Sequence, residues 1–313
     1  MKCVVTGGCG FIGSHVVDGL VARGDRVVVL DDLSTGYAAK VNPEAELLRG
    51  SILDEDLLGD ALLGADRVFH LAALPRVPRS IEDPVGTHRV NVDGTLNVLQ
   101  AAREAGVDRV VYSSSSSVYG DQPTHLMSED MVPNPLSPYA LHKLIGEQYA
   151  GMFARLYGMT VVSLRYFNVY GPGQPFEGAY ALVIGKFLSL RRSGRPLTIY
   201  GDGQQTRAYS HVDDVVRANL LAADADVPAG RNTVMNIGPA EEISVNRIAE
   251  IVGGDVMYLT PNPRGDMEEQ RKAADYSRAA SVLGWEPTIS LGEGLEALKE
   301  GARGCLWMFV VNV

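Results

Sequence analysis

A tyrosine and a lysine four residues apart are the residues of this 313-residue chain best suited to proton transfer. Ser137 and Pro138 just before them are favoured at the N-cap and at the first position of a helix. Tyr139 and Lys143 then occupy positions i and i+4 on one face of that helix. An ammonium group stabilises a nearby phenolate, which can accept the proton of a substrate hydroxyl. We therefore predict that Tyr139 is a general base whose pKa Lys143 lowers.

Five consecutive serines, Ser113 to Ser117, precede this helix and follow an apolar segment. Apolar runs of this length are typical of buried parallel strands, whose carboxyl ends carry the ligands in this class of fold. A serine of the run is therefore expected to hydrogen-bond the same hydroxyl that Tyr139 attacks. Without the Tyr–Lys pair, the run could also be a polar loop.

A glycine-rich turn follows the apolar residues Val4 and Val5 near the N-terminus. Gly8, Gly10 and Gly13 match the pattern GxGxxG, and Gly7, Gly10 and Gly13 match GxxGxxG. Such glycines permit a tight turn and close approach to a pyrophosphate, and the helix that follows offers free N–H groups to the phosphates. A strand before the turn and a helix after it predict a dinucleotide site.

Two carboxylates, Asp31 and Asp32, stand at the end of the next apolar run. A carboxylate at this point accepts hydrogen bonds from ribose hydroxyls and repels a 2′-phosphate. No arginine lies within 33–37 to receive such a phosphate. The predicted cofactor is therefore NAD rather than NADP.

Short apolar runs alternate with amphipathic segments through the first half of the chain. The predicted strands are Lys2–Thr6, Arg26–Leu30, Arg67–Leu71, Arg109–Ser113 and Thr160–Arg165, and the predicted helices are Phe11–Arg23, Asp54–Leu63, Asp83–Glu104 and Pro138–Tyr157. This alternation predicts an α/β protein with a Rossmann-type doubly wound parallel sheet.

The pattern becomes less regular after residue 166, which predicts a smaller C-terminal α/β substrate-binding domain. Its expected strands are Leu197–Tyr200 and Thr233–Ile237, and its expected helices are Ser244–Val252, Tyr276–Leu283 and Leu291–Glu300. We assign residues 1–166 to the NAD-binding domain, with a return segment near 208–230, and residues 167–207 and 231–313 to the substrate domain. The apolar tail 305–313 is expected to dock on the core.

Composition excludes several other classes of protein. A net charge of −10 is unsuited to a nucleic-acid-binding chain. The three cysteines have no metal-ligand or disulfide spacing, so no metal site is predicted. With no signal peptide and no apolar run long enough to span a bilayer, a cytoplasmic protein without membrane contact is expected.

Taken together, these motifs resemble the extended short-chain dehydrogenase/reductases, specifically the nucleotide-sugar 4-epimerases that act on UDP-glucose or UDP-N-acetylglucosamine. The matching segments span most of the chain: TGGCGFIGSH, LDDLSTG, HLAA, NVDGTLNVLQAA, SSSSSVYG, SPYALHK, LRYFNVYGPGQ and IYGDGQQTR. The stretches VPRSIEDP and GAYALVI are most similar to bacterial UDP-N-acetylglucosamine 4-epimerases. The resemblance implies bound NAD and a UDP-sugar substrate.

The resemblance also implies which residues form the site. The catalytic residues would be Ser115, Tyr139 and Lys143. The cofactor contacts would be Gly7, Gly10, Phe11, Ile12, Gly13, Asp31, Asp32, Ser51, Ile52, Leu71, Ala72, Ala73, Asn91, Ser113, Tyr139, Lys143 and Tyr166. The substrate contacts would be Ser115, Ser117, Asn168, Val183, Tyr200, Arg207 and Arg264, with Tyr200 stacking on uracil and Asn168, Arg207 and Arg264 contacting the diphosphate.

Three positions depart from the family pattern. Ser51 replaces the aspartate that contacts adenine, and Ala208 replaces the aspartate after the first diphosphate arginine. Gln270, Arg271 and Lys272 occupy the region of the residue that gates the sugar pocket. None is aromatic, and long cationic stems can swing aside, so room for a 2-acetamido group is expected.

The resulting hypothesis is reversible, NAD-dependent C4 epimerisation of a UDP-hexose through a 4-keto intermediate. A 4,6-dehydratase is disfavoured because Ser116 and Ser117 replace the Asp-Glu pair that elimination requires. A UDP-glucuronate 4-epimerase needs a cation for the carboxylate, which Arg76 or Arg79 could supply. A dinucleotide-binding sensor without turnover would usually lack the intact Tyr–Lys pair.

The resemblance further implies a homodimer that pairs the helical segments Asp83–Glu104 and Pro138–Tyr157 across a two-fold axis. The apolar positions Val98, Leu144, Phe153 and Leu156 could face either that partner or the sheet.

Overall fold

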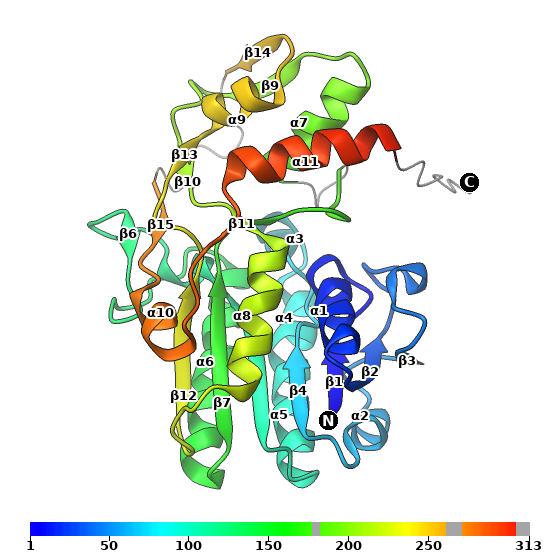
Figure 1. Cartoon of the computed structure of the whole chain (residues 1–313). Coiled ribbons are helices and arrows are strands. Elements are labelled where there is room, and N and C mark those ends of the chain that lie inside the picture. The colour runs from blue at the N-terminus through cyan, green and yellow to red at the C-terminus, as the bar shows by residue number, and fades with distance from the viewer. Residues whose placement is uncertain (177–181, 261–270, 305–313) are drawn as a thin grey trace.

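A parallel sheet forms the centre of the computed structural model, which describes residues 1–176, 182–260 and 271–304, with side chains described up to residue 300. Within these ranges the sheet has seven strands in the order β12-β7-β5-β4-β1-β2-β3. Their bounds are β1 Lys2–Thr6, β2 Arg26–Asp31, β3 Glu46–Arg49, β4 Arg67–His70, β5 Arg109–Ser115, β7 Thr160–Tyr166 and β12 Asn232–Ile237. All of the arrows in Figure 1 that belong to this sheet point the same way.

The strand order reverses at β1, which explains where a ligand can bind. From β1 the chain first adds β2 and β3 on one side and then crosses to β4, β5 and β7 on the other. Val4 pairs with Val28 of β2 and with Val68 of β4. The crevice outside the carboxyl ends of β1 and β4 is therefore the switch point at which open α/β sheets bind ligands.

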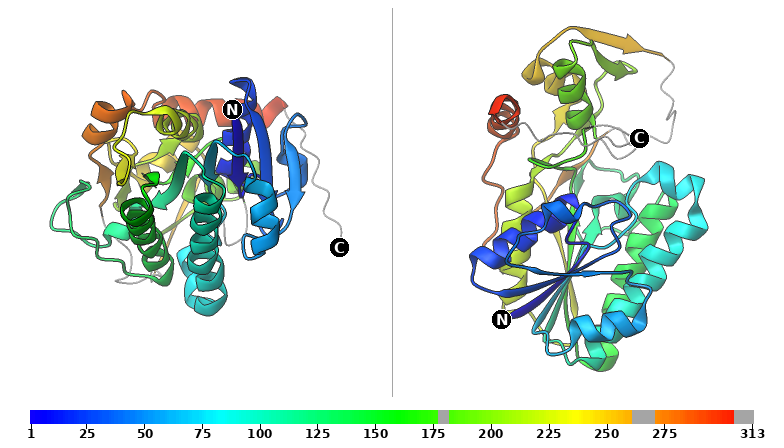
Figure 2. Two further views of the ribbon diagram at one scale, coloured as in Figure 1. Left: turned by 90° about the horizontal axis from the view of Figure 1, so that it is seen from below. Right: turned by 90° about the vertical axis from the view of Figure 1, so that its right-hand side faces the viewer.

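Helices cover both faces of the sheet, as the end-on view in Figure 2 shows. One buried apolar cluster joins the sheet to α1, α8 and α10, and a second joins it to α2, α5 and α6. The bounds are α1 Phe11–Ala22, α2 Glu55–Leu62, α5 Gly94–Glu104, α6 Pro138–Tyr157, α8 Val212–Asp224 and α10 Ser277–Leu283. Strands buried on both faces need the continuous apolar runs that the sequence contains.

A smaller region lies over the carboxyl ends of the strands (Figure 1). It contains α7, α9 and α11, which share a separate apolar cluster, and four two-stranded ladders: β9–β14, β10–β13, β8–β11 and β6–β15. The bounds are β6 Leu126–Met127, β8 Val169–Tyr170, α7 Val183–Arg192, β9 Leu197–Tyr200, β10 Thr206–Arg207, β11 Ser210–His211, β13 Ile243–Ser244, α9 Val245–Val252, β14 Val256–Leu259, β15 Ala273–Ala274 and α11 Leu291–Gly304.

The fold class is confirmed, and most predicted elements have their observed bounds within two residues. The predicted helix Asp83–Glu104 is divided, however, into α4 Pro84–His88, a π-helical turn Arg89–Asp93 and α5. Asp83 caps α4, because its carboxylate accepts the N–H of Gly86 at 2.9 Å. A short helix, α3 Val77–Glu82, precedes it, and two 3₁₀ turns lie at Ala38–Lys40 and Ser116–Tyr119.

The strand near residue 233 is not part of the smaller region, where it was predicted. As β12 it pairs in parallel with β7 and forms an edge of the main sheet. Met235 and Ile237 are fully buried beneath α8 and α10 in the apolar cluster of the sheet. The return segment near 208–230 does reach the sheet, because α8 packs on its face beside α1.

Three predictions, for Arg264, Gln270 and the tail 305–313, fall outside the described residues. Among the helices that the structure describes, none has both the length and the apolar character that a membrane crossing requires.

Candidate active site

The glycine turn forms a cradle that leaves no room for a side chain at Gly7 or Gly13. Gly7 has a φ of +75°, which favours glycine, and a Cβ there would lie 2.6 Å from the backbone N of Ala72. A Cβ on Gly13 would lie 2.1 Å from the carbonyl oxygen of Gly7. Helix α1 begins after Gly10 with no side-chain cap, so the first N–H groups of the helix, from Phe11 and Ile12 onward, are available to an anion.

Asp31 lies beside this cradle at the end of β2. Its carboxylate is 8% exposed and accepts the backbone N–H groups of Cys9 at 2.9 Å and Leu33 at 2.8 Å. The segment with Ser51 and Ile52 runs alongside, because the N–H of Gly50 donates to the carbonyl of Asp31. Asp32 is more exposed and accepts the N–H of Ser34. A fixed carboxylate at the end of the strand that follows the glycine turn and its helix fits the ribose of a dinucleotide.

The loop after β4 forms the other wall of the cradle. Leu71 donates its N–H to the carbonyl of Thr6, and Ala72 donates its N–H to the Thr6 hydroxyl. Ala73 continues this loop. Asn91, which was expected to approach the cofactor, is buried and exchanges two hydrogen bonds with the backbone of Leu74, at 2.7 and 3.0 Å. In this structure Asn91 therefore anchors the loop.

Ser115, Tyr139 and Lys143 come together where β5 ends against α6. The Ser137 hydroxyl caps α6 by accepting the N–H of Ala140, as predicted. The Ser115 hydroxyl hydrogen-bonds the phenol of Tyr139. The Lys143 ammonium donates to the carbonyl of Ser113 at 2.7 Å and lies 5.1 Å from the centre of the Tyr112 ring. These contacts give one site a phenol, a hydroxyl and a buried cation.

Burial has opposite effects on the two titrating groups of this site. It raises the pKa of Tyr139, although the hydrogen bond from Ser115 and the charge of Arg76 each lower this pKa in part. It lowers the pKa of Lys143 to about 8, which the charge of Glu147 opposes. The cation that lowers the pKa of Tyr139 in this structure is therefore Arg76, whereas the sequence predicted that Lys143 would do so.

Arg76 occupies an unusual backbone position next to this site. Its φ is +95°, which is rare for a residue with a side chain, and it directly precedes α3. The loop is held on both sides: Leu74 is bonded to Asn91, and the Ser80 hydroxyl accepts the N–H of Tyr139 at 3.0 Å. The sequence showed only that position 76 is an arginine, and nothing in it indicated that Arg76 lies beside Tyr139.

Tyr166 lies beside Ser115 in the sheet, since the two are register partners of β7 and β5. Its hydroxyl and the side-chain amide of Asn219 in α8 hydrogen-bond each other at 2.8–3.0 Å. Burial raises the pKa of Tyr166 to about 12, so this phenol stays protonated at neutral pH. Its ring is thus fixed at the edge of the site.

The predicted substrate contacts are partly gathered over the sheet. Asn168 donates to the carbonyl of Ala208, the residue after Arg207, and Arg207 donates to the carbonyl of Thr206. Tyr200 ends β9 with 43% of its surface exposed. Val183 begins α7, partly buried against the cluster of the smaller region.

The expectation that the gate side chains swing aside is wrong for Lys272. Lys272 is 2% exposed, and its ammonium donates to the carbonyl of Ser116 at 3.1 Å, because β15 packs beside the serine run. Arg271 instead bonds the Glu242 carboxylate. The sequence did not indicate that the Lys272 ammonium contacts the backbone of Ser116.

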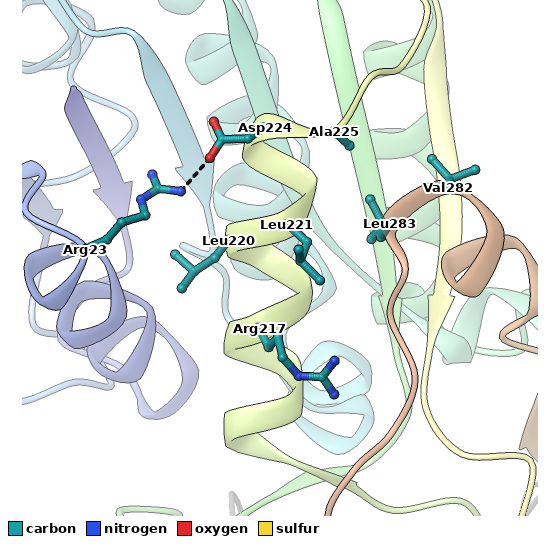
Figure 3. Close-up of a pocket in the computed structure, with 8 residues that line it drawn as sticks. All are labelled: Arg23, Arg217, Leu220, Leu221, Asp224, Ala225, Val282 and Leu283. Atoms are coloured by element: carbon teal, nitrogen blue, oxygen red, sulfur yellow. Dashed lines mark hydrogen bonds and ion pairs between the residues drawn. The ribbon is translucent and has the colours of Figure 1, made fainter.

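A surface pocket away from the carboxyl ends of the strands contains none of the predicted site residues. It lies among α1, α8 and α10, where Arg23 and Asp224 form an ion pair across its rim (Figure 3). Leu220 and Leu283 supply part of its apolar lining. The residues that could do chemistry are therefore at the carboxyl ends of the strands.

Comparison with known proteins identifies the family of this chain. Residues 3–238 match the family described as the NAD dependent epimerase/dehydratase family. A UDP-glucose 4-epimerase of Mycolicibacterium smegmatis is 41% identical over 97% of this chain and 99% of its own length.

Two solved structures have closely similar folds. The UDP-glucose 4-epimerase of Thermotoga maritima, solved with UDP-glucose, has a TM-score of 0.90 and 39% identity, covering 97% of this chain and 99% of its own. The UDP-N-acetylglucosamine 4-epimerase of Methanobrevibacter ruminantium, solved with UDP-N-acetylmuramic acid, has a TM-score of 0.88 and 34% identity, covering 96% and 98%. The chain therefore belongs to the NAD dependent epimerase/dehydratase family, among the extended short-chain dehydrogenase/reductases that its motifs indicate, and its cofactor is NAD.

Proposed function

We propose that the protein catalyses the reversible inversion of C4 in a UDP-hexose, through a 4-keto sugar. The observation that carries this proposal is the meeting of Ser115, Tyr139 and Lys143 at the end of β5, beside a cradle that fits a dinucleotide. The similarity to UDP-sugar 4-epimerases over nearly the whole chain supports it.

Each of these residues has a role that its surroundings support. Tyr139 takes the proton of the sugar 4-hydroxyl, and Ser115, which hydrogen-bonds the phenol, steadies the same oxygen. We assign the Lys143 ammonium to the ribose of the cofactor, and Arg76 supplies the positive charge that favours the phenolate of Tyr139. Bound NAD would accept the hydride of C4 and return it to the opposite face of the keto sugar. Proton return from Tyr139 completes the inversion once the keto sugar has presented its other face.

Dehydration is disfavoured by the groups next to Ser115. Elimination of water needs an acid and a base, whereas Ser116 is a buried hydroxyl and the Ser117 hydroxyl donates to Ser115 at 2.9 Å. An alcohol does not ionise near neutral pH, so neither residue can perform that step.

The test is incubation of the purified protein with UDP-glucose, UDP-N-acetylglucosamine and UDP-glucuronate, with the 4-epimers separated by chromatography. We expect UDP-glucose and UDP-N-acetylglucosamine both to be converted, without added reductant. Denatured protein should release NAD at a substantial fraction of one per chain, because an epimerase must keep its cofactor between half-reactions. Absence of any epimer with all three substrates overturns the proposal.

A second candidate substrate, UDP-glucuronate, is favoured by Arg76. Its charge acts on Tyr139, the residue that faces the reacting sugar, and a guanidinium suits a carboxylate. If the sugar is a uronic acid, Arg76→Ser lowers kcat/KM for UDP-glucuronate by roughly 10- to 100-fold relative to UDP-glucose. An equal loss with both sugars assigns Arg76 to the phenol alone.

We also propose a homodimer through α5 and α6. Of the four apolar positions named from the sequence, Val98 and Phe153 are buried against the sheet, Leu144 is partly buried and Leu156 is 61% exposed. Leu141 and Met152 on α6 are also exposed. Sedimentation at micromolar concentration tests this, and a strictly monomeric profile rejects it.

A further inference from the structure

A buried ion pair that the proposed reaction does not use directly lies next to Lys143, one turn further along α6. Glu147 of α6 is 6% exposed and Arg165 of β7 is 4% exposed. The carboxylate accepts from Arg165 Nε at 2.9 Å and from Nη2 at 2.7 Å. Burying two charges is costly unless they are paired and hydrogen-bonded, so their retention inside the protein needs a reason.

The ion pair continues a face of α6 that contacts the end of β5 turn by turn. Tyr139, Lys143 and Glu147 are spaced four residues apart, and residues at this spacing share one helix face. Tyr139 meets the hydroxyl of Ser115, Lys143 bonds the carbonyl of Ser113, and the Glu147 carboxylate accepts the hydroxyl of Ser114. Three successive residues of β5 are therefore held by three successive turns of one helix.

Arg165 is itself fixed, which makes the position of Glu147 rigid. Its guanidinium lies 4.6 Å from the centre of the Tyr119 ring, and the Tyr119 hydroxyl donates to Asn236 of β12. The backbone carbonyl of Glu147 accepts from the side chain of Asn232, also in β12. Burial lowers the pKa of Arg165, but its hydrogen bond and charge contact with Glu147 raise it above the ordinary value.

The electrostatic effect of Glu147 reaches Lys143. Burial lowers the pKa of Lys143 to about 8, and the negative charge of Glu147 is the influence that opposes this loss. The titratable groups around the two side chains are Arg165 of β7, His70 of β4, Tyr112 of β5 and His142 of α6. Burial, with the charge of Lys143, lowers the pKa of His70 to about 3, so His70 is neutral and adds no competing charge.

We propose that Glu147 is a positioning residue of this active site: held by Arg165, it fixes the serine run through Ser114 and places a negative charge one helical turn from Lys143. The inference rests on the proposed function, because it assigns Glu147 a task in the same reaction. A merely structural ion pair would stabilise the fold without affecting how activity depends on pH.

The decisive variant replaces the pair together, as Glu147→Gln with Arg165→Met. Glutamine keeps an acceptor for Ser114, and removing both charges avoids leaving a buried arginine without its partner. Lys143 then loses its proton at lower pH. We expect the alkaline limb of the kcat profile to move down by ~1 pH unit. Binding of NADH, followed by its fluorescence, should weaken over the same pH range, which gives a readout independent of turnover.

Two further variants separate charge from position. Ser114→Ala keeps the charge of Glu147 but removes its hold on β5, so kcat should fall severalfold with the alkaline limb unmoved. Asp214→Asn is the matched control: Asp214 is also a buried, arginine-paired carboxylate, but it lies in α8. It should lower the melting temperature and leave the pH profile as it is.

The outcomes distinguish the two levels of the proposal. If the unmodified protein epimerises no UDP-sugar, the proposed function fails, and the NADH titration still shows whether Glu147 acts on Lys143. If the unmodified protein is active and the alkaline limbs of both kcat and NADH binding stay in place in the double variant, the positioning role is overturned. A shift of equal size in Asp214→Asn overturns it as well.

Discussion

The two regions of the molecule hold their site residues in opposite ways. At the end of the sheet, Lys143, Tyr166 and Asn91 are buried and each is bonded to another part of the protein. Over the sheet, Tyr200 is 43% exposed, and within the described chain the Arg207 guanidinium donates only to the neighbouring carbonyl of Thr206. In the proposed function, the reacting end of the site is therefore preassembled, and the nucleotide end is expected to gain its contacts when the substrate binds. Changes at the first should affect kcat, and changes at the second should affect KM.

The largest effect is expected at the preassembled end, from Tyr139→Phe. The ring still packs, but no group remains to accept the hydroxyl proton, so kcat should fall by ~10²- to 10⁴-fold. Binding of the UDP-sugar, measured by calorimetry, should be unchanged. Turnover close to that of the unmodified protein would remove Tyr139 from its role and break the contrast between the regions.

Gly13→Ala tests the cradle at the same end. The added Cβ would lie 2.1 Å from the carbonyl oxygen of Gly7, and backbone on both sides cannot move aside cheaply. We expect the purified variant to carry less than about a tenth of the normal NAD, as judged by absorbance after denaturation, since a loss of ~1.4 kcal/mol in binding is tenfold. Gly24→Ala, where no heavy atom lies near the new Cβ but φ is +86°, controls for strain alone. Equal NAD content in both variants contradicts the cradle.

Arg207→Ala sharpens the comparison from the nucleotide end. Loss of a charged hydrogen bond to the diphosphate should raise KM by roughly tenfold and leave kcat within about twofold. Steady-state kinetics over a range of UDP-sugar concentrations separates the two parameters. A fall in kcat with KM unchanged would place Arg207 among the groups that act on the reacting carbon.

The smallest effect is expected at the joint between the regions. Asp214 of α8 accepts the N–H groups of Thr288 and Ile289, which lead into α11. Burial raises the pKa of Asp214, but hydrogen bonds from Thr288 and Arg217 outweigh it and lower the pKa overall. The carboxylate therefore stabilises the fold above its unfolded pKa near 3.8, and this stabilisation is lost as pH falls through the folded value.

In Asp214→Asn, the free energy of unfolding should decrease by about 2 kcal/mol at neutral pH. The difference from the unmodified protein should shrink below about pH 4, where the carboxylate is protonated first in the unfolded chain, and should vanish once the folded carboxylate, with its lower pKa, is protonated as well. Urea unfolding at a series of pH values measures both. A difference that stays constant into acid would show that the charge of Asp214 contributes nothing.

The parts of this molecule that a sequence can predict are those governed by local pattern. Lys2–Thr6 and Pro138–Tyr157 have their predicted bounds because a continuous apolar run and a Ser-Pro start each specify an element without distant help. The spacing of Tyr139 and Lys143, and the family resemblance for Ser115, were enough to propose a catalytic group, and the structure brings these three residues together. The predictions that were wrong, for Lys272 and for the strand near residue 233, concern packing between segments that are far apart along the chain.

Two residues illustrate that limit. Lys272 has a sequence position that is compatible with an exposed, mobile side chain, yet the pairing of β15 with β6 buries it beside Ser116. Ile237 belongs to a short apolar run that either region could accommodate, and only its pairing with Tyr166 assigns it to the sheet. Neither contact has a local sequence signal, because the partners are far apart along the chain.

The position of β12 has a consequence for how the chain is made. β7 is synthesised some 70 residues before its outer neighbour, since residues 160–166 must wait for residues 232–237. Until then β7 is an open edge, and unpaired strand edges promote association between chains. A nascent chain stalled in the interval, or a fragment that ends before residue 232, would therefore be prone to aggregate, although it already contains the glycine cradle and Ser115, Tyr139 and Lys143.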